Sequence, residues 1–398
     1  MTAFVIDASG LCDGRADGPC RVVVDRGVVR SVEALDGPPE LVAVDGDGLV
    51  LAPGFVDLQI NGGFGIDLAS DPAGLWELGR HLPRTGVTAF QPTIVSSPER
   101  VRREALDALR RRPSDYLGAV PVGLHFEGPM LTPDRRGAHP ASELRSIDPD
   151  LVAGWSQAAG VAMVTLAPEL PGALDLIVEL TGRRVTVALG HSDAEADVAD
   201  AAVTAGASVV THLFNAMAPF HHRQPGLAGV ALTDDRLTVG VIVDGVHLDP
   251  RTVLLAWRTL GPERLALVTD AVAAMGMGDE EQTLGATRVR ADHGVVRNDA
   301  GVLAGSTLTM EEAVQNLVRW TGCRLDEAVR CASGTPAAAL GDFRRGRVAP
   351  GSVADLVLLD SDGSVAITIC GGEVAHVSES AVGRVPAPLV EGSNRWRS

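Results

Sequence analysis

Acidic and histidine side chains follow several apolar segments of this chain, and their types suit metal-assisted hydrolysis. Glu127, His191 and His212 offer one carboxylate and two imidazoles, a competent three-ligand set for a divalent metal that leaves a fourth position for water. Such a metal lowers the pKa of a water toward about 7. Asp270 follows another apolar segment and has the chemistry to take that proton and pass it to a leaving amine. For any one of these residues, the capping of a loop is the simpler alternative.

The wide spacing of these residues means that the fold must bring them together. From about residue 51 to residue 272 the sequence alternates apolar runs with amphipathic stretches, and eight of the apolar runs end in polar residues. The eight ends lie near Asp57, Gln91, His125, Glu169, His191, His212, Asp244 and Asp270. Eight β-then-α units over about 250 residues predict an α/β fold of the (β/α)8 TIM-barrel type, in which catalytic groups gather at the carboxyl ends of the strands. A doubly wound sheet is the competing architecture.

Both ends of the chain have a different character. Short β-branched runs punctuated by Gly, Asp and Pro occupy them, and this pattern predicts strands joined by tight turns. We therefore predict a small β-sandwich domain built from residues 1–52 and 344–398, and a metal-dependent barrel of residues 53–343.

Composition excludes several classes of function. All 34 basic residues are arginine, so the chain cannot form a lysine Schiff base, a P-loop ending in Lys-Ser or Lys-Thr, or a metal pair bridged by a carbamylated lysine. The net charge of −17 disfavours nucleic acid and anionic membranes as partners. The five cysteines are an odd number without a Cys-x-x-Cys pair, and no segment has the pattern of an export signal or a membrane span. We therefore expect a cytoplasmic protein with reduced thiols.

The order of the polar motifs resembles that of a known family. The chain contains PGFVDLQINGGFGIDL, HFEGPML followed by RRGAHP, LGHSDA, THLFNAMAPFHHRQPGLAG, IVDGVHLDP, LVTDAVAAMG, AGSTLTM and GRVAPGSVADLVLLD, in that order. These motifs are similar to those of the amidohydrolase superfamily and, within it, of the N-acetylglucosamine-6-phosphate deacetylases. The resemblance covers essentially the whole chain and implies metal-dependent removal of acetate from N-acetyl-D-glucosamine 6-phosphate.

The resemblance also implies roles for the residues that carry the chemistry. Glu127, His191 and His212 would hold one divalent metal ion per chain, with zinc as the first choice and iron, cobalt or manganese as alternatives. Asp270 would be the general base and acid. His139 would contact the sugar and the acetyl group and stabilise the developing oxyanion.

Further residues are implied to bind the phosphorylated sugar. His247 matches a histidine near the sugar and the phosphate. Arg223 matches an arginine that reaches the phosphate in the neighbouring subunit, which implies a homodimer. The remaining matches are Asn215 and Ala216, whose backbone amides would meet the phosphate, and Leu308 and Met310, which would border the N-acetyl group.

One motif departs from the superfamily pattern. Many members carry His-x-His as additional metal ligands at the end of the first strand, whereas this chain has Gln59-Ile60-Asn61. Amides are poor zinc ligands compared with imidazole, so we expect one catalytic metal and not a pair. Gln59 and Asn61 either form hydrogen bonds at the barrel floor or help to position water, and we count both among the predicted substrate-binding residues.

Two other functions stay open on the sequence alone. The first is N-acetylgalactosamine-6-phosphate deacetylase, because the two sugars differ in the orientation of one hydroxyl. The second is a non-catalytic scaffold that kept the barrel and lost the chemistry, although all four residues of the predicted centre are present.

Overall fold

The largest part of the protein is a parallel barrel, seen in a computed structural model that describes residues 3–12, 18–279 and 281–390. Its strands are β5 (Phe55–Ile60), β8 (Val87–Val95), β10 (Leu124–Glu127), β11 (Val161–Leu166), β12 (Thr186–Leu189), β13 (Val209–Val210), β14 (Thr238–Val241) and β15 (Leu265–Leu267). The two-residue strand β9 (Val120–Pro121) pairs with β8 beside this path. Every residue of β8 is buried, as expected for a strand with helices on one face and the barrel interior on the other.

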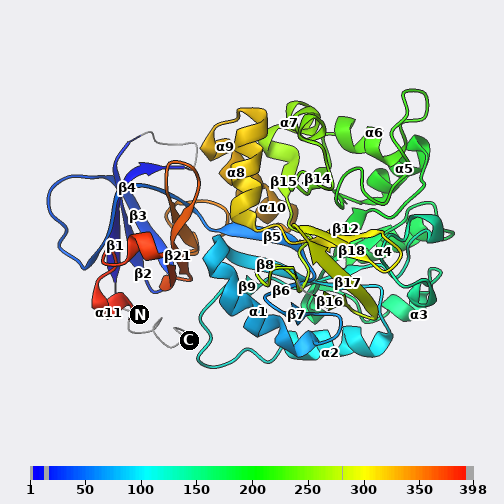
Figure 1. Cartoon of the computed structure of the whole chain (residues 1–398), viewed down its shortest axis with the longest axis horizontal. Helices are drawn as coiled ribbons and strands as arrows, with labels where there is room; N and C mark the ends of the chain where they lie inside the picture. Colours follow the sequence, from blue (N-terminus) through cyan, green and yellow to red (C-terminus); the bar gives the residue numbers. More distant parts are fainter. Residues whose placement is uncertain (1–2, 13–17, 280, 391–398) are drawn as a thin grey trace.

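Helices surround the barrel strands (Figure 1). They are α1 (Leu75–His81), α2 (Glu99–Leu109), α3 (Pro149–Val152), α4 (Ala173–Gly182), α5 (Ala196–Ala205), α6 (Gly226–Thr233), α7 (Pro250–Arg264), α8 (Met310–Thr321), α9 (Leu325–Ala332) and α10 (Gly334–Ala339). In α8, Thr309 and Glu312 form a reciprocal capping box, and Gly322 ends the helix in the left-handed conformation with φ of 72°. Among the helices of the described ranges, none has the length and apolar character needed to cross a membrane.

The barrel closes between its last strand, β15, and its first, β5. Ile60 and Ala271 form a parallel bridge at this seam. Below the bridge, the Thr269 hydroxyl donates a hydrogen bond of 2.5 Å to Asp57, whose pKa burial raises to about 7. A closed seam confirms the predicted barrel and excludes an open, doubly wound sheet.

Strands from both ends of the chain form one seven-stranded sheet, in which blue and red-brown ribbons lie together in Figure 1. The strands are β1 (Phe4–Leu11), β2 (Cys20–Asp25), β3 (Val28–Ala34), β4 (Ala43–Pro53), β20 (Leu356–Leu359), β21 (Val365–Cys370) and β22 (Glu373–Val377), and α11 (Ala387–Val390) follows them. Their order is β22-β21-β20-β4-β1-β2-β3. The sheet curls back on itself. Its edge strand β3 reaches the segment before β20, where the Val29 amide donates to the Ser352 carbonyl at 3.0 Å. The expected small β domain built from both chain ends is confirmed, with one curled sheet serving as the sandwich; the exact domain boundaries stay predictions.

An antiparallel sheet, not expected from the sequence, is inserted after the eighth barrel strand. It consists of β16 (Glu281–Leu284), β17 (Thr287–Asp292), β18 (Val295–Asn298) and β19 (Leu303–Ser306), and its yellow ribbons cross the barrel in Figure 1. The hairpin of β6 (Gly62–Gly63) and β7 (Ile66–Asp67) supports it. Asp67 accepts hydrogen bonds from the Thr283 hydroxyl and the Gly285 amide, both at 2.8 Å.

Candidate active site

The residues predicted to carry the chemistry lie at the carboxyl ends of the barrel strands. Glu127 is the last residue of β10, His191 follows β12 by two residues, and His212 follows β13 by two. Asp270 follows β15 by three residues. Because parallel strands end on the same face of a barrel, residues that are far apart in sequence meet there.

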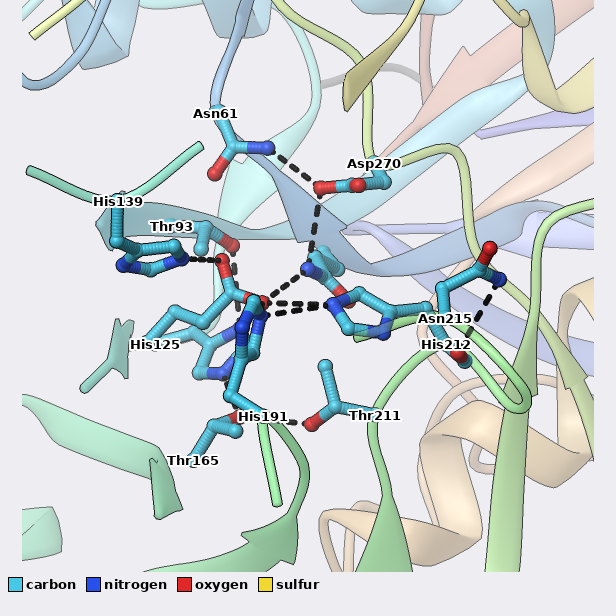
Figure 2. A network of polar contacts seen from close by, with 12 residues as sticks. Asn61, Thr93, His125, His139, Thr165, His191, Thr211, His212, Asn215 and Asp270 are labelled. Carbon is cyan, nitrogen blue, oxygen red and sulfur yellow. Dashed lines mark hydrogen bonds and ion pairs between the residues drawn. The ribbon is translucent and has the colours of Figure 1, made fainter. Parts of the chain in front are cut away.

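Three ligand atoms form a nearly equilateral triangle. The Nε2 atoms of His191 and His212 lie 3.2 and 3.1 Å from Glu127 Oε1 and 3.1 Å from each other. Figure 2 shows the rings of His139, His191 and His212 converging on one point, with Asp270 on another side of it. All four of these residues are buried. Two imidazole nitrogens and a carboxylate oxygen this close together need a proton or a cation between them.

Hydrogen bonds to backbone groups fix the orientation of two of the rings. His191 Nδ1 lies 2.8 Å from the Arg135 carbonyl oxygen, which can only accept, so Nδ1 carries the hydrogen and Nε2 has a free lone pair. In His139 the arrangement is reversed. The Ser96 amide donates to Nδ1 at 3.1 Å, so the hydrogen of the neutral ring is on Nε2, which lies 3.4 Å from Glu127 Oε2.

The donor set fits a divalent metal such as zinc. The triangle edges of 3.1–3.2 Å approach the separation of roughly 3.3 Å expected between two ligands of a tetrahedral zinc with bonds of about 2.0–2.1 Å. Glu127, His139 and His191 are also close enough together to hold a metal. We assign the third position to His212 and not to His139, because the Ser96 amide leaves His139 with a hydrogen on the nitrogen that faces the site.

Burial and hydrogen bonding shift the pKa values of these groups in different directions. Burial acts to raise the pKa of Glu127, but hydrogen bonds from His139, His191 and His212 hold that pKa well below its ordinary value. Burial lowers the pKa of His191 to about 4. Burial also acts to lower the pKa of His212, but the hydrogen bond to Glu127 and the negative charges of Glu127 and Asp270 together raise this pKa. An ionised Glu127 beside a neutral His191 is the state that metal ligation requires.

Two amides hold the carboxylate of Asp270. Gln59 Nε2 and Asn61 Nδ2 donate to Asp270 Oδ1 at 3.0 and 2.7 Å, and Gln59 Nε2 also lies 2.9 Å from Glu127 Oε1. Among the described residues, no hydrogen bond reaches Asp270 Oδ2. Burial and the neighbouring charge of Glu127 raise the pKa of Asp270 to about 6. A carboxylate with this pKa is ionised at neutral pH and is still basic enough to carry a proton.

A cavity of about 360 Å³ opens above these residues. Its walls include Asn61, Glu127, His139, His191, His212, Asn215, Ala216, His247 and Asp270. His247 Nδ1 lies 2.7 Å from Asp244 Oδ2, and Asp244 Oδ1 also accepts from the His247 amide at 2.8 Å. This pairing directs the other ring nitrogen of His247 away from Asp244.

Besides Gln59, whose amide binds Glu127 and Asp270, three of the predicted substrate residues do not line this cavity. Leu308 is buried, and its amide donates to the Ser306 hydroxyl at 3.0 Å. Met310, the first residue of α8, is fully buried. The inserted sheet supplies the nearby wall instead, through residues 302–305. Arg223 is exposed in a loop, where it contacts His222 at 2.9 Å. The substrate contacts of these three residues stay predictions.

Ser96 and Arg135 orient the rings of His139 and His191 through backbone groups, and neither was predicted from the sequence. Any residue type offers a backbone amide or carbonyl, so neither carried a signal. The wall at residues 302–305 was not predicted either. There, the alternation in TRVRADHGVVRNDAGVLAG was a usable strand and turn signal.

Comparison with known proteins shows the family of this chain. The sequence pattern of the amidohydrolase family matches residues 50–375. The chain is 41% identical over 354 residues to N-acetylglucosamine-6-phosphate deacetylase of Bos taurus, covering 85% of this chain and 86% of the relative. It is 37% identical over 340 residues to the protein of the same name from Bacillus subtilis, covering 83% of this chain and 86% of the relative.

Solved structures are also similar over nearly the whole chain. A mutant N-acetyl-D-glucosamine-6-phosphate deacetylase from Mycobacterium smegmatis, in complex with N-acetyl-D-glucosamine-6-phosphate, has a TM-score of 0.87 and 35% identity, and the match covers 95% of this chain and 100% of that one. The N-acetylglucosamine-6-phosphate deacetylase of Thermotoga maritima has a TM-score of 0.86 and 32% identity, with 94% and 100% covered. With this geometry and these relatives, the chain belongs to the amidohydrolase family and, within it, to the N-acetylglucosamine-6-phosphate deacetylases.

Proposed function

We propose that this enzyme hydrolyses the N-acetyl group of N-acetyl-D-glucosamine 6-phosphate to give glucosamine 6-phosphate and acetate, with one zinc ion per chain. The observation that carries the proposal is the triangle of Glu127, His191 and His212 beside a carboxylate of raised pKa, Asp270. When bound by these three residues, a divalent metal supplies a Lewis acid for the amide carbonyl and lowers the pKa of water. A cytoplasmic location is part of the same proposal.

The chain's own residues handle the protons of this reaction. Gln59 and Asn61 occupy Oδ1 of Asp270, so Oδ2 is the oxygen that takes a proton from the attacking water. Asp270 then returns that proton to the amine nitrogen as the C–N bond breaks, which makes the departing group neutral. His139 presents Nε2–H to the carbonyl oxygen, where negative charge develops.

We propose that phosphate recognition needs a residue from a second subunit. Arg135 is the arginine among the described residues that line the cavity, and it is already paired with Asp193 at 2.5 Å. Arg223 is exposed and carries no ion pair in the described structure, and Phe220, three residues earlier in the same loop, is 51% exposed. We propose that the loop with Arg223 enters the active site of the neighbouring subunit in a homodimer. There, the planar Arg223 guanidinium donates two parallel hydrogen bonds to the phosphate.

The direct test is acetate release from a panel of sugars after loading with zinc. N-acetylglucosamine and N-acetylgalactosamine, each with and without the 6-phosphate, form the panel. We expect the highest kcat/KM for the phosphorylated gluco sugar. A preference for the galacto phosphate would move the assignment to the alternative substrate, and a metal-loaded protein that releases no acetate from any of the four would favour a scaffold.

Arg223→Ala tests the proposed phosphate contact. Loss of a charge-assisted hydrogen bond of about 1.5–3 kcal/mol should lower kcat/KM for the 6-phosphate by roughly 10- to 150-fold and leave the unphosphorylated sugar unchanged. Equal losses on both sugars would argue against phosphate recognition. Heterodimers of Arg223→Ala and Asp270→Asn chains should regain part of the activity, because one of their two sites is then intact; no recovery in proven heterodimers would place Arg223 in its own chain's site.

A further inference from the structure

Glu169 lies after the fourth barrel strand and has no role in the proposed reaction. It follows β11 by three residues and is absent from the walls of the cavity. Its Oε2 accepts from the Ser192 hydroxyl at 2.7 Å, and its Oε1 accepts from the Asp193 amide at 2.6 Å and from the Thr132 hydroxyl. Three donors already engage both carboxylate oxygens, so Glu169 acts on other residues of the protein and not on a substrate.

The three donors belong to two loops whose relative position must be kept. One loop, residues 128–139, contains Thr132 and Arg135; the other, residues 190–194, contains His191 and its two successors. The hydrogen bond from His191 Nδ1 to the Arg135 carbonyl joins the loops at 2.8 Å. That bond keeps the lone pair of His191 Nε2 facing Glu127. Any relative movement of the two loops would turn the His191 ring away from the other ligand atoms.

The backbone at His191 does not hold this position by itself. Its φ is +52°, in the left-handed region that residues with a side chain rarely adopt unless their surroundings impose it. The Thr132 amide donates to the His191 carbonyl at 3.1 Å, and Glu169 binds the two residues that follow His191. These contacts from outside the loop impose the strained conformation.

We propose that Glu169 is a positioning residue for the metal ligand His191, and that it sets the affinity and the coordination geometry of the metal. The inference rests on the proposed metal site. The Arg135–Asp193 ion pair of 2.5 Å is a second link between the loops, so loss of Glu169 weakens the site without abolishing it. Substitutions of residues that orient a ligand typically cost about 10- to 100-fold in metal affinity.

The test uses metal-free protein titrated with cobalt(II) alone and followed by visible absorption, which reports both affinity and geometry. Glu169→Ala should raise the Kd for cobalt by about 10- to 100-fold and change the absorption bands. Glu169→Gln should stay within a few-fold of wild type, because its amide oxygen can accept from Thr132 and Asp193 while its NH2 group donates to Ser192. The control is Glu104→Ala, since Glu104 is an exposed residue of α2 paired with Arg100 at 2.9 Å; its Kd should not change.

A purely structural role for Glu169 predicts something different. A Glu169→Ala protein with a lower melting temperature but the Kd and absorption bands of wild type would overturn the proposal. If that variant does not fold, Ser192→Ala removes a single donor and should raise the Kd by a few-fold, whereas an unchanged Kd would count against us. Because the probe is cobalt without substrate, this result does not depend on which sugar the enzyme deacetylates.

Discussion

The barrel mouth and the small β domain differ in how their backbones are held. At the mouth, His191, His212 and Asp270 have φ values of 52°, 28° and 49°, and each carries a group of the candidate site. Within the described part of the small domain, Arg26 at the tip of the β2–β3 hairpin is the non-glycine residue with positive φ. Left-handed conformations at non-glycine residues cost on the order of 1–3 kcal/mol each.

Backbone strain is therefore concentrated at the barrel mouth, whereas the small domain contributes mainly to the stability of the fold. The inner face of the seven-stranded sheet is filled by aliphatic side chains such as Leu356, Leu358 and Ile367, all fully buried. Burial of such side chains stabilises the fold by about 1.5–3 kcal/mol each. Single substitutions should therefore change either activity or stability, according to the region in which they fall.

The largest effect is expected for His212→Ala at the mouth. Removal of one of three metal ligands should lower both metal affinity and kcat/KM. Each loss should exceed the roughly 100-fold typical of residues that only orient a ligand. Elemental analysis and turnover measure the two losses. The matched control is Arg184→Ala, because Arg184 also has a positive φ, 61°, but is exposed ahead of β12 and offers no metal ligand. Full metal occupancy in His212→Ala would mean that the ligand is wrongly assigned.

Asp270→Asn should separate chemistry from metal binding. The amide keeps the shape of the carboxylate and can still accept from Gln59 and Asn61, but it cannot take a proton. The expected result is a fall in kcat of roughly 100-fold or more with metal retained. The free energy of unfolding should not decrease, because the substitution removes a buried charge. A kcat near that of wild type would remove Asp270 from the mechanism.

His376 in the small domain should affect stability and its pH dependence but not turnover. Burial, assisted by the charge of Arg84, lowers its pKa to about 4, below the ordinary 6.5. The folded state therefore resists a proton that the unfolded chain accepts, so stability is lost as the pH falls from about 6.5 to about 4. For a partly exposed ring we expect a loss of about 2 kcal/mol.

Urea unfolding of wild type and His376→Gln at pH 7.5 and pH 4.5 measures this contribution. The stability of the wild type should fall further than that of the variant over this range. Parallel losses in the two proteins would show that His376 is already protonated, or fully solvated, in the folded state.

The smallest effect is expected for Ile367→Val in the core of the small domain. Deletion of one buried methyl group should cost about 1 kcal/mol of unfolding free energy. The kcat of the folded enzyme should equal that of wild type, because the substitution leaves the barrel mouth untouched. A reduced kcat with unchanged metal content would show that the two regions are coupled.

The barrel and the position of the candidate site could be predicted because both follow from simple patterns. Buried parallel strands appear as apolar runs such as VTAFQPTIV, and the polar residues after them must share one face. Local pattern does not show which ring nitrogen carries a hydrogen. For His139 that depends on the amide of Ser96, which is remote in sequence, and for His191 on the carbonyl of Arg135.

Two other features escaped the sequence analysis for different physical reasons. Left-handed backbone at His191, His212 and Asp270 is imposed by tertiary contacts, and only glycine would have signalled it. The inserted sheet lies where the βα alternation was expected to end, so its alternating, half-buried strand β17 was overlooked despite the turn residues on either side.

The segment that carries the inserted sheet leaves the barrel and rejoins it at one point. The Ser306 amide donates to the Asp270 carbonyl at 2.9 Å, the Val272 amide donates to the Ser306 carbonyl at 3.0 Å, and Ala271 is bridged to Ser306. A segment that starts and finishes at the same point can be lengthened, shortened or exchanged without altering the path of the strands beneath it. Because residues 302–305 of this segment also line the cavity, a change in the length of the segment would reshape the cavity wall while the barrel strands keep their path.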